Sequence, residues 1–285
     1  MKKIVVFLTL ICLFSCKTKE VDKRVISVTI EPQRYFAEKI AGDRFQINCV
    51  VPTGQSPETY DPTPQQMVEI GKSEAYFRIG YIGFELAWME HIAQNNQQLK
   101  IVDLSEGMEL ITNHWEHGDH YHGAVDPHLW TSFNGAKKII LNMLNAFIVL
   151  DPENKSVYQA NYTQLIKEIE ETQKEVDALL KPLLSRTFII YHPALTYLAG
   201  EYNLTQLCIE MDGKEPSPVQ LKELVDTAKN HNVRVVFVQQ EFDRKNGELI
   251  AQETGCRLVT INPLNYDWSQ EMIHIAKALA DEEVN

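Results

Sequence analysis

The stretch DPENKSVYQANYTQLIKEIEETQKEVDALLKPLL, residues 151–184, contains the longest helical pattern in the sequence. Asp151 followed by Pro152 is a helix start signal, and Pro182 marks the end. Apolar side chains then recur at alternating spacings of four and three, which predicts one continuous helix with a single apolar stripe. At 1.5 Å per residue, about 28 residues span roughly 42 Å, more than one small domain needs. The stripe consists of Tyr158, Tyr162, Leu165, Ile169, Thr172, Val176, Leu179 and Leu183.

Strand-like apolar runs alternate with helical patterns on both sides of this helix. Near-continuous apolar strands separated by helices are typical of parallel sheets covered on both faces. The sequence therefore predicts an α/β protein with two lobes, each a roughly four-stranded parallel sheet with flanking helices, joined by one long rigid helix. A coiled-coil segment for dimerisation is the alternative interpretation of 151–184. The predicted strands are 25–30, 45–51, 75–79 and 100–104, then 187–191, 204–209, 233–238 and 256–261.

Four segments follow from this pattern. They are a signal peptide at 1–15, an N-terminal lobe at 16–150 with a His-rich loop at 113–123, a linking helix at 151–185, and a C-terminal lobe at 186–285.

Two predicted helices, one in each lobe, begin with the same pattern of residues. Thr63-Pro64 and Ser217-Pro218 each place a hydroxyl at the N-cap and proline at the first helical position, with glutamine two residues further on.

The N-terminus has the features of a bacterial lipoprotein signal. Lys2 and Lys3 precede an apolar run at 4–14 that is too short to span a bilayer. Leu13-Phe14-Ser15-Cys16 resembles a lipobox, in which cleavage before the cysteine is followed by its lipidation. Acyl chains on Cys16 would anchor the protein at a bacterial membrane, facing the periplasm or the cell exterior. An ordinary secretory signal with a chance cysteine is the alternative.

Charge and cysteine content exclude some classes of function. Removal of Lys2 and Lys3 leaves 25 basic and 39 acidic residues, a net charge of −14, which argues against a nucleic-acid partner. Cys49, Cys208 and Cys256 form no CxxC pair, so a Cys-rich zinc module is excluded. A disulfide between Cys208 and Cys256 stays open, with buried thiols as the other interpretation.

Histidine is concentrated in one short region. Five of the nine histidines fall between positions 114 and 128, and neutral imidazole is a common ligand of divalent transition metals. A solvated polar loop is the structural alternative. The cluster consists of His114, His117, His120 and His122, followed by His128.

Further candidate ligands lie just after predicted strands, where open α/β sheets bind their ligands. If the two lobes face each other there, Glu58 and His128 come from one lobe, and His192 with Glu241 or Asn262 comes from the other. Each also has a structural interpretation. These are a helix-start or surface carboxylate for Glu58, a loop residue after an Asp-Pro turn for His128, a core histidine for His192, an exposed or locally hydrogen-bonded carboxylate for Glu241, and a turn cap for Asn262. The convergence of these residues predicts a metal site between the lobes.

Several motifs, in this order, resemble the zinc/manganese substrate-binding lipoproteins of ABC transporters, the periplasmic zinc-binding and metal-binding "adhesin" family. The resemblance covers essentially the whole chain after the signal. Each motif is weak alone, but the ordered set is specific. The motifs are Val51-Pro52-x-Gly54-x-x-Pro57-Glu58-x-Tyr60-x-Pro62, Asp126-Pro127-His128-Leu129-Trp130, Tyr191-His192-Pro193-Ala194, Glu215-Pro216-Ser217-Pro218, Glu253-Thr254-Gly255-Cys256 and Asn262-Pro263-Leu264.

The resemblance implies two lobes, a rigid connecting helix, and a monomer that delivers its metal to an ABC permease instead of performing catalysis. It also implies a ligand set of Glu58, His128 and His192, completed by Asn262, Glu241 or water. Glu58 stands where the family usually has histidine, and Asn262 where it usually has an acidic residue. Zinc is favoured by His192 and the His-rich loop, whereas carboxylate oxygen also suits manganese or iron.

Two other classes of function remain as alternatives. His120-Tyr121-His122 followed by Asp126 and His128 faintly suggests a zinc-dependent hydrolase, but the spacing differs from HxHxDH. HExxH, GxSxG and Walker A motifs are absent from the sequence. A surface adhesin is permitted by the lipid anchor, although no other sequence feature requires it.

Overall fold

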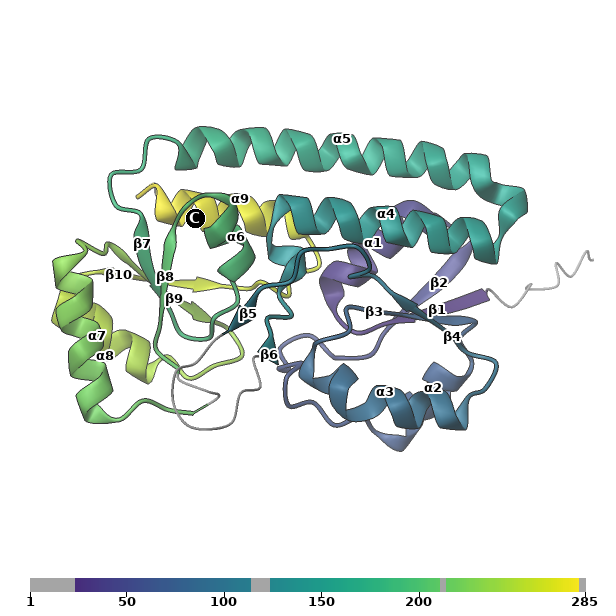
Figure 1. Ribbon diagram of the computed structural model, residues 1–285, viewed down its shortest axis with the longest axis horizontal. Helices are drawn as coiled ribbons and strands as arrows, with labels where there is room; N and C mark the ends of the chain where they lie inside the picture. The colour runs from purple at the N-terminus through teal and green to yellow at the C-terminus, as the bar shows by residue number, and fades with distance from the viewer. Residues whose placement is uncertain (1–23, 114–123, 211–213, 282–285) are drawn as a thin grey trace, which may run out of the picture.

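Two four-stranded parallel sheets form the framework of the computed structural model, which describes residues 24–113, 124–210 and 214–281 (Figure 1). The first sheet contains β1 (Arg24–Val28), β2 (Phe45–Cys49), β3 (Ala75–Arg78) and β4 (Lys100–Asp103), in the order β2-β1-β3-β4. The second contains β7 (Thr187–Ile190), β8 (Thr205–Cys208), β9 (Val235–Gln239) and β10 (Arg257–Ile261), in the order β10-β9-β7-β8. The two sheets thus have the same topology, and all eight strands predicted from the sequence are present.

Helices cover both faces of each sheet (Figure 1). In the first lobe, α1 (Glu31–Ala41) and α4 (Phe133–Leu150) lie on one face, and α2 (Pro64–Gly71) and α3 (Gly83–Asn95) on the other. In the second, α6 (Thr196–Glu201) and α9 (Trp268–Leu279) lie opposite α7 (Pro218–Asn230) and α8 (Lys245–Thr254). The predicted caps are confirmed: the Thr63 and Ser217 hydroxyls accept hydrogen bonds from the backbone N–H groups of Gln66 and Gln220. No helix in these residues has the length and apolarity to cross a bilayer.

The long helix α5 (Lys155–Leu180) lies along the top of both lobes in Figure 1 and begins three residues later than predicted. The residues Pro152–Asn154 form a 3-10 turn instead of the first helical turn. The Asp151 carboxylate holds this turn by accepting hydrogen bonds from Tyr158 Oη at 2.5 Å and Asn154 Nδ2 at 2.8 Å. The helix then packs against α1 and α4 of the first lobe and α9 of the second.

The lobes also pack directly on each other, so α5 is not their only connection. One hydrophobic core extends from Ile26 and Val28 of the first sheet to Phe188 and Phe237 of the second. Two tryptophans close the seam between the lobes: Trp130 Nε1 donates to the carbonyl of Pro263 at 2.8 Å, and Trp268 Nε1 donates to the carbonyl of Trp130 at 2.6 Å.

A short antiparallel hairpin, β5 (Thr112–Asn113) and β6 (Ala124–Val125), was not anticipated. It brackets the His-rich segment, whose residues His114, His117, His120 and His122 lie outside the described residues, as does Cys16. Tyr197 of the second lobe binds the base of this hairpin. Its hydroxyl accepts from the N–H of Ile111 and donates to the carbonyl of Asp126, both at 3.0 Å.

The described cysteines settle the disulfide question. Cys49, Cys208 and Cys256 are all free thiols. Cys208 ends β8 and Cys256 precedes β10, and these strands form opposite edges of the second sheet. A bond between them is therefore excluded by the fold.

A buried carboxyl group connects β1, β3 and the start of α3. The Glu85 carboxylate accepts hydrogen bonds from the Thr29 hydroxyl and from the N–H groups of Ile79 at 3.0 Å and Gly80 at 2.5 Å. Burial is the largest influence and raises the pKa of Glu85 from 4.5 to about 7, although these hydrogen bonds oppose the shift. Folding therefore favours the protonated form of this group.

This pKa predicts a pH-dependent stability that the Glu85→Gln variant lacks. The stabilisation associated with protonated Glu85 is present below pH 4.5 and is lost as pH rises through about 7. Between pH 5 and pH 8, guanidinium unfolding should show the wild type losing about 2 to 3 kcal/mol more than Glu85→Gln. Glu90→Gln, at an exposed position on the same helix, is the control. Equal pH dependence in wild type and Glu85→Gln would contradict this account.

Candidate metal site between the lobes

Residues from both lobes line one small pocket at the carboxyl ends of the strands. Its volume is about 20 Å³, enough for one water molecule or one ion. Glu58 follows β2, His128 follows the hairpin, His192 follows β7 and Glu241 follows β9. The lining residues are Ser56, Pro57, Glu58, His128, Trp130, His192, Ala194, Glu241, Phe242, Pro263 and Leu264.

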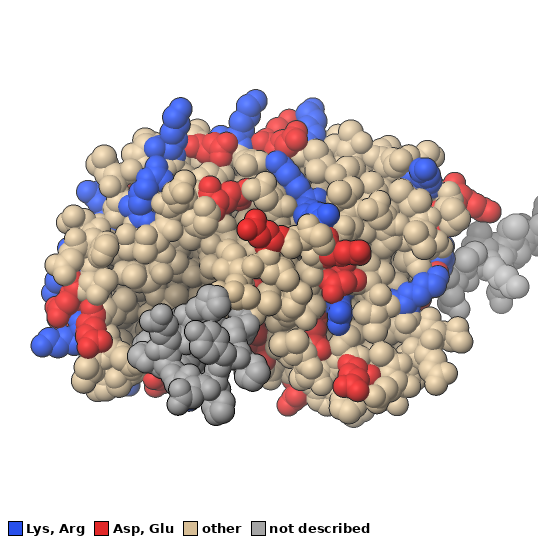
Figure 2. All heavy atoms as spheres, viewed as in Figure 1, with Lys and Arg blue, Asp and Glu red and all other residues tan. Residues whose placement is uncertain are grey.

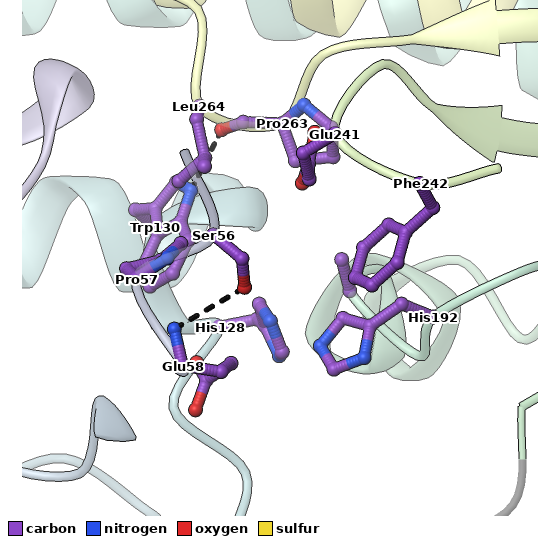
Figure 3. A pocket seen from close by; sticks show the side chains of 11 residues that line it. Ser56, Pro57, Glu58, His128, Trp130, His192, Glu241, Phe242, Pro263 and Leu264 are labelled. Atoms are coloured by element: carbon purple, nitrogen blue, oxygen red, sulfur yellow. Dashed lines mark hydrogen bonds between the residues drawn. The ribbon is translucent and has the colours of Figure 1, made fainter. Parts of the chain in front are cut away.

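The two histidine rings lie next to each other across the lobe junction, with ring centroids 5.1 Å apart. Figure 3 shows Glu58 beside these rings and Glu241 on the other side of the pocket, near Pro263. His192 comes from the switch point of the second sheet, where β7 and β9 are neighbours and connections leave in opposite directions. The Gln239 side-chain amide holds the backbone of His192 in place by donating a hydrogen bond to the His192 carbonyl at 2.7 Å.

A carboxylate lies behind each histidine ring. Asp126 Oδ1 is 2.9 Å from His128 Nδ1 and also accepts from the His128 N–H at 2.9 Å. Glu210 Oε1 and Oε2 lie 3.3 and 3.2 Å from His192 Nδ1. Such a pairing places the proton on Nδ1 and leaves Nε2 with a free lone pair, the tautomer that metal-binding histidines use.

Two pocket atoms, Glu58 Oε1 and His192 Nε2, are buried and have no hydrogen-bond partner among the described residues. Buried polar atoms are nearly always satisfied, so these two mark a place where a ligand would complete the bonding. Within the described ranges, no three His, Cys, Asp or Glu side chains stand as a ready-made coordination set. A cation would therefore draw the side chains of Glu58, His128 and His192 closer together.

The ionisable groups in and around the pocket shift each other's pKa values. Burial lowers the pKa of His128, but the charge and hydrogen bond of Asp126, aided by Glu58 and Glu241, outweigh it and leave that pKa above its usual value. Burial raises the pKa of Glu241, against the opposing effect of His192 and His128. Two acidic groups and two imidazoles in one closed space are a suitable environment for a divalent cation.

Asn262 lies outside this group. Its Oδ1 accepts a hydrogen bond from the backbone N–H of Leu264 at 3.2 Å, so the side chain caps a turn. It lines a separate small cavity beside Val51 and Pro52. Glu210, by contrast, was not among the residues predicted from the sequence. Its position, two residues beyond the end of β8 and next to β7, is the signal that could have identified it.

Replacing the carboxylate behind His128 should lower the pKa of that histidine. In Asp126→Asn the charge that raises this pKa is removed, whereas the burial that lowers it remains. We expect imidazole NMR titration to place the His128 pKa below its wild-type value. Asp61→Asn, a change in a loop outside the pocket lining, should leave the titration unchanged. An unaltered His128 pKa in Asp126→Asn would show that the pair does not interact.

Comparisons with known proteins agree with this geometry. The chain matches the family model of zinc-uptake complex component A, periplasmic, over residues 26–282. It is 29% identical over 255 residues to the high-affinity zinc uptake system protein ZnuA of Bacillus subtilis (strain 168), covering 85% of this chain and 79% of that protein. It is 25% identical over 269 residues to the manganese ABC transporter substrate-binding lipoprotein PsaA of Streptococcus anginosus, covering 88% and 85%.

A solved structure shows the same fold. The crystal structure of ZnuA superposes with a TM-score of 0.85 at 37% sequence identity, covering 92% of this chain and 99% of that one. The match extends over both lobes, the helix between them and the strands that carry the pocket. The chain therefore belongs to the family of zinc-uptake complex component A, the periplasmic ZnuA family.

Proposed function

We propose that this protein captures a divalent transition metal outside the cytoplasm, with zinc as the preferred ion, and delivers it to an ABC permease for import. The observation that supports this most strongly is the pair of buried, unpartnered atoms, Glu58 Oε1 and His192 Nε2, in a pocket of about 20 Å³. Membership in the zinc-uptake family and the name of the Bacillus subtilis relative support the same function.

The proposed ligands are Glu58, His128 and His192, with Glu241 or water in the fourth position. Two imidazole nitrogens and one carboxylate oxygen resemble zinc sites that keep one position open. Asn262 is left out of this set because its oxygen already caps a turn. Manganese or iron is the alternative cargo, since carboxylate suits harder cations and one relative is named for manganese.

We further propose that the protein carries its metal without performing catalysis. The pocket has the volume of one ion, whereas a zinc-dependent hydrolase must also admit an organic substrate. A family of substrate-binding transport proteins supports the same conclusion. The hydrolase alternative has no observation in its favour within the described residues.

The cellular setting is part of the proposal. Lipidation at Cys16 would hold a monomer at the membrane surface beside its permease, and the manganese relative is itself named a lipoprotein. Nucleic acid is an unsuitable partner because the chain is acidic, with 39 acidic and 27 basic residues. On the face shown in Figure 2, basic side chains are scattered among acidic ones instead of forming a continuous patch in the described part of the chain.

Loss of either imidazole should abolish tight zinc binding. We expect calorimetry on metal-free His128→Ala and His192→Ala to show zinc affinity reduced by at least about 100-fold, because each variant removes one proposed ligand. His274→Ala is the control, since His274 lies outside the pocket lining, is partly exposed and binds the carbonyl of Thr260. An unchanged dissociation constant would remove that histidine from the site.

The His-rich loop provides a contrast in the same experiment. We propose that His114, His117, His120 and His122 bind zinc weakly and raise its local concentration. Deletion of 114–122 should therefore remove weak additional sites and leave the tight site intact. Loss of the tight site in this deletion would place one of its ligands in the loop.

A further inference from the structure

Glu58 has a structural task besides facing the pocket, because it contacts the start of α3. That helix begins after Ile82, whose apolar side chain cannot cap the free N–H groups of the first turn. The loop between β2 and α2 supplies the missing acceptors. The Gly83 N–H donates to Glu58 Oε2 at 3.0 Å, and the Phe84 N–H donates to the carbonyl of Pro57 at 2.9 Å.

The other oxygen of the same carboxylate has a different environment. Glu58 Oε1 is buried and has no hydrogen-bond partner within residues 24–113, 124–210 and 214–281, and Glu58 lines the pocket together with His128 and His192. In Figure 3 the Glu58 side chain lies next to the His128 ring. One oxygen is thus committed to the helix, and the other faces the space between the lobes.

The close approach of loop and helix requires glycine at position 83. A Cβ atom there would lie 2.2 Å from the carbonyl oxygen of Glu58 and 2.8 Å from its Cα, distances that backbone atoms cannot accept. Any side chain at this position would displace Glu58. Gly83 therefore determines where the carboxylate of Glu58 lies.

We propose that the two oxygens of Glu58 have separate tasks: Oε2 caps α3 through Gly83, and Oε1 alone binds the cation, which makes Gly83 a positioning residue for the metal site. This inference rests on the proposed function. It implies that Glu58 gives the metal one oxygen, which suits four-coordinate zinc better than cations that gather six or more oxygen ligands.

Position 58 then requires two acceptor atoms, and other side chains fail for definable reasons. In Glu58→Gln, only the amide oxygen can accept the Gly83 N–H, so the NH₂ group must face the cation. A histidine that binds metal through one nitrogen carries its proton on the other, and that proton would oppose the Gly83 N–H. Carboxylate is the side chain that satisfies both neighbours at once.

The test separates the two tasks by measuring stability and affinity in the same variants. We expect metal-free Glu58→Gln to melt near the wild-type temperature, because its amide oxygen still caps α3. Glu58→Ala should melt about 2–4 °C lower through loss of the cap. Calorimetry with zinc should show both variants weakened about 100-fold or more, and equally, because neither offers an oxygen to the metal.

Three results would overturn the inference. An affinity of Glu58→Gln midway between wild type and Glu58→Ala would show that the amide oxygen turns to the metal. A Glu58→Ala melting temperature equal to that of the wild type would show that Oε2 does not cap α3, and a Glu58→Gln melting temperature as low as that of Glu58→Ala would show that the amide oxygen does not replace the cap. If each of the three single variants Glu58→Ala, His128→Ala and His192→Ala kept wild-type zinc affinity, the proposed function itself would be refuted.

Alanine variants at Gly83 and Gly71 form a matched pair that tests the positioning role. Gly83→Ala should lower zinc affinity at least tenfold, because its new Cβ displaces the Glu58 backbone. Gly71→Ala also creates a close contact in the first lobe, 2.6 Å to the Asn96 side chain, but lies away from the pocket lining. It should keep wild-type affinity in the folded protein. Equal zinc affinity in both variants would exclude a positioning role for Gly83.

Discussion

The shared hydrophobic core between the two lobes determines the geometry of everything else. Glu58 and His128 belong to one lobe and His192 and Glu241 to the other, so the distance between the lobes sets the size of the pocket. That distance is fixed at the seam, where Trp130 and Trp268 bury their rings, Trp130 donates a hydrogen bond to Pro263 and Trp268 donates one to the Trp130 carbonyl. A dense core of this kind resists continuous deformation, so the two halves of the pocket are held at a fixed spacing.

The architecture could be predicted from the sequence because buried parallel strands and a striped helix leave strong local patterns. All eight sheet strands were found, and α5 differs by one turn at its start, where Asp151 binds Tyr158 and Asn154. The hairpin β5–β6 was missed because two-residue strands carry no periodicity. Direct packing of the lobes was also missed, since it depends on contacts between residues more than 100 positions apart. The segment boundaries at 150 and 185 remain predictions.

Part of the pocket lining could be predicted from the position of residues in the sequence. Glu58, His128 and His192 follow strands or a motif, and the fold brings them to one place. Glu210 was missed although it also follows a strand, and the role of Gly83 could not be read from the sequence because it depends on Glu58, 25 positions away. Asn262 follows a strand as well, yet its oxygen is used locally. A position just after a strand thus places a residue near the carboxyl edge of the sheet. Whether its side chain is free to face the pocket depends on the hydrogen bonds that it makes.

The placement of Trp268 has a consequence for how the chain folds. This residue begins the last helix, and its ring lies 5.5 Å from those of both Phe36 in the first helix and Phe133 at the start of α4. Phe36 and Phe133 therefore cannot be fully covered until the C-terminal residues have been synthesised. A chain stopped before Trp268 would leave this apolar surface exposed to aggregation.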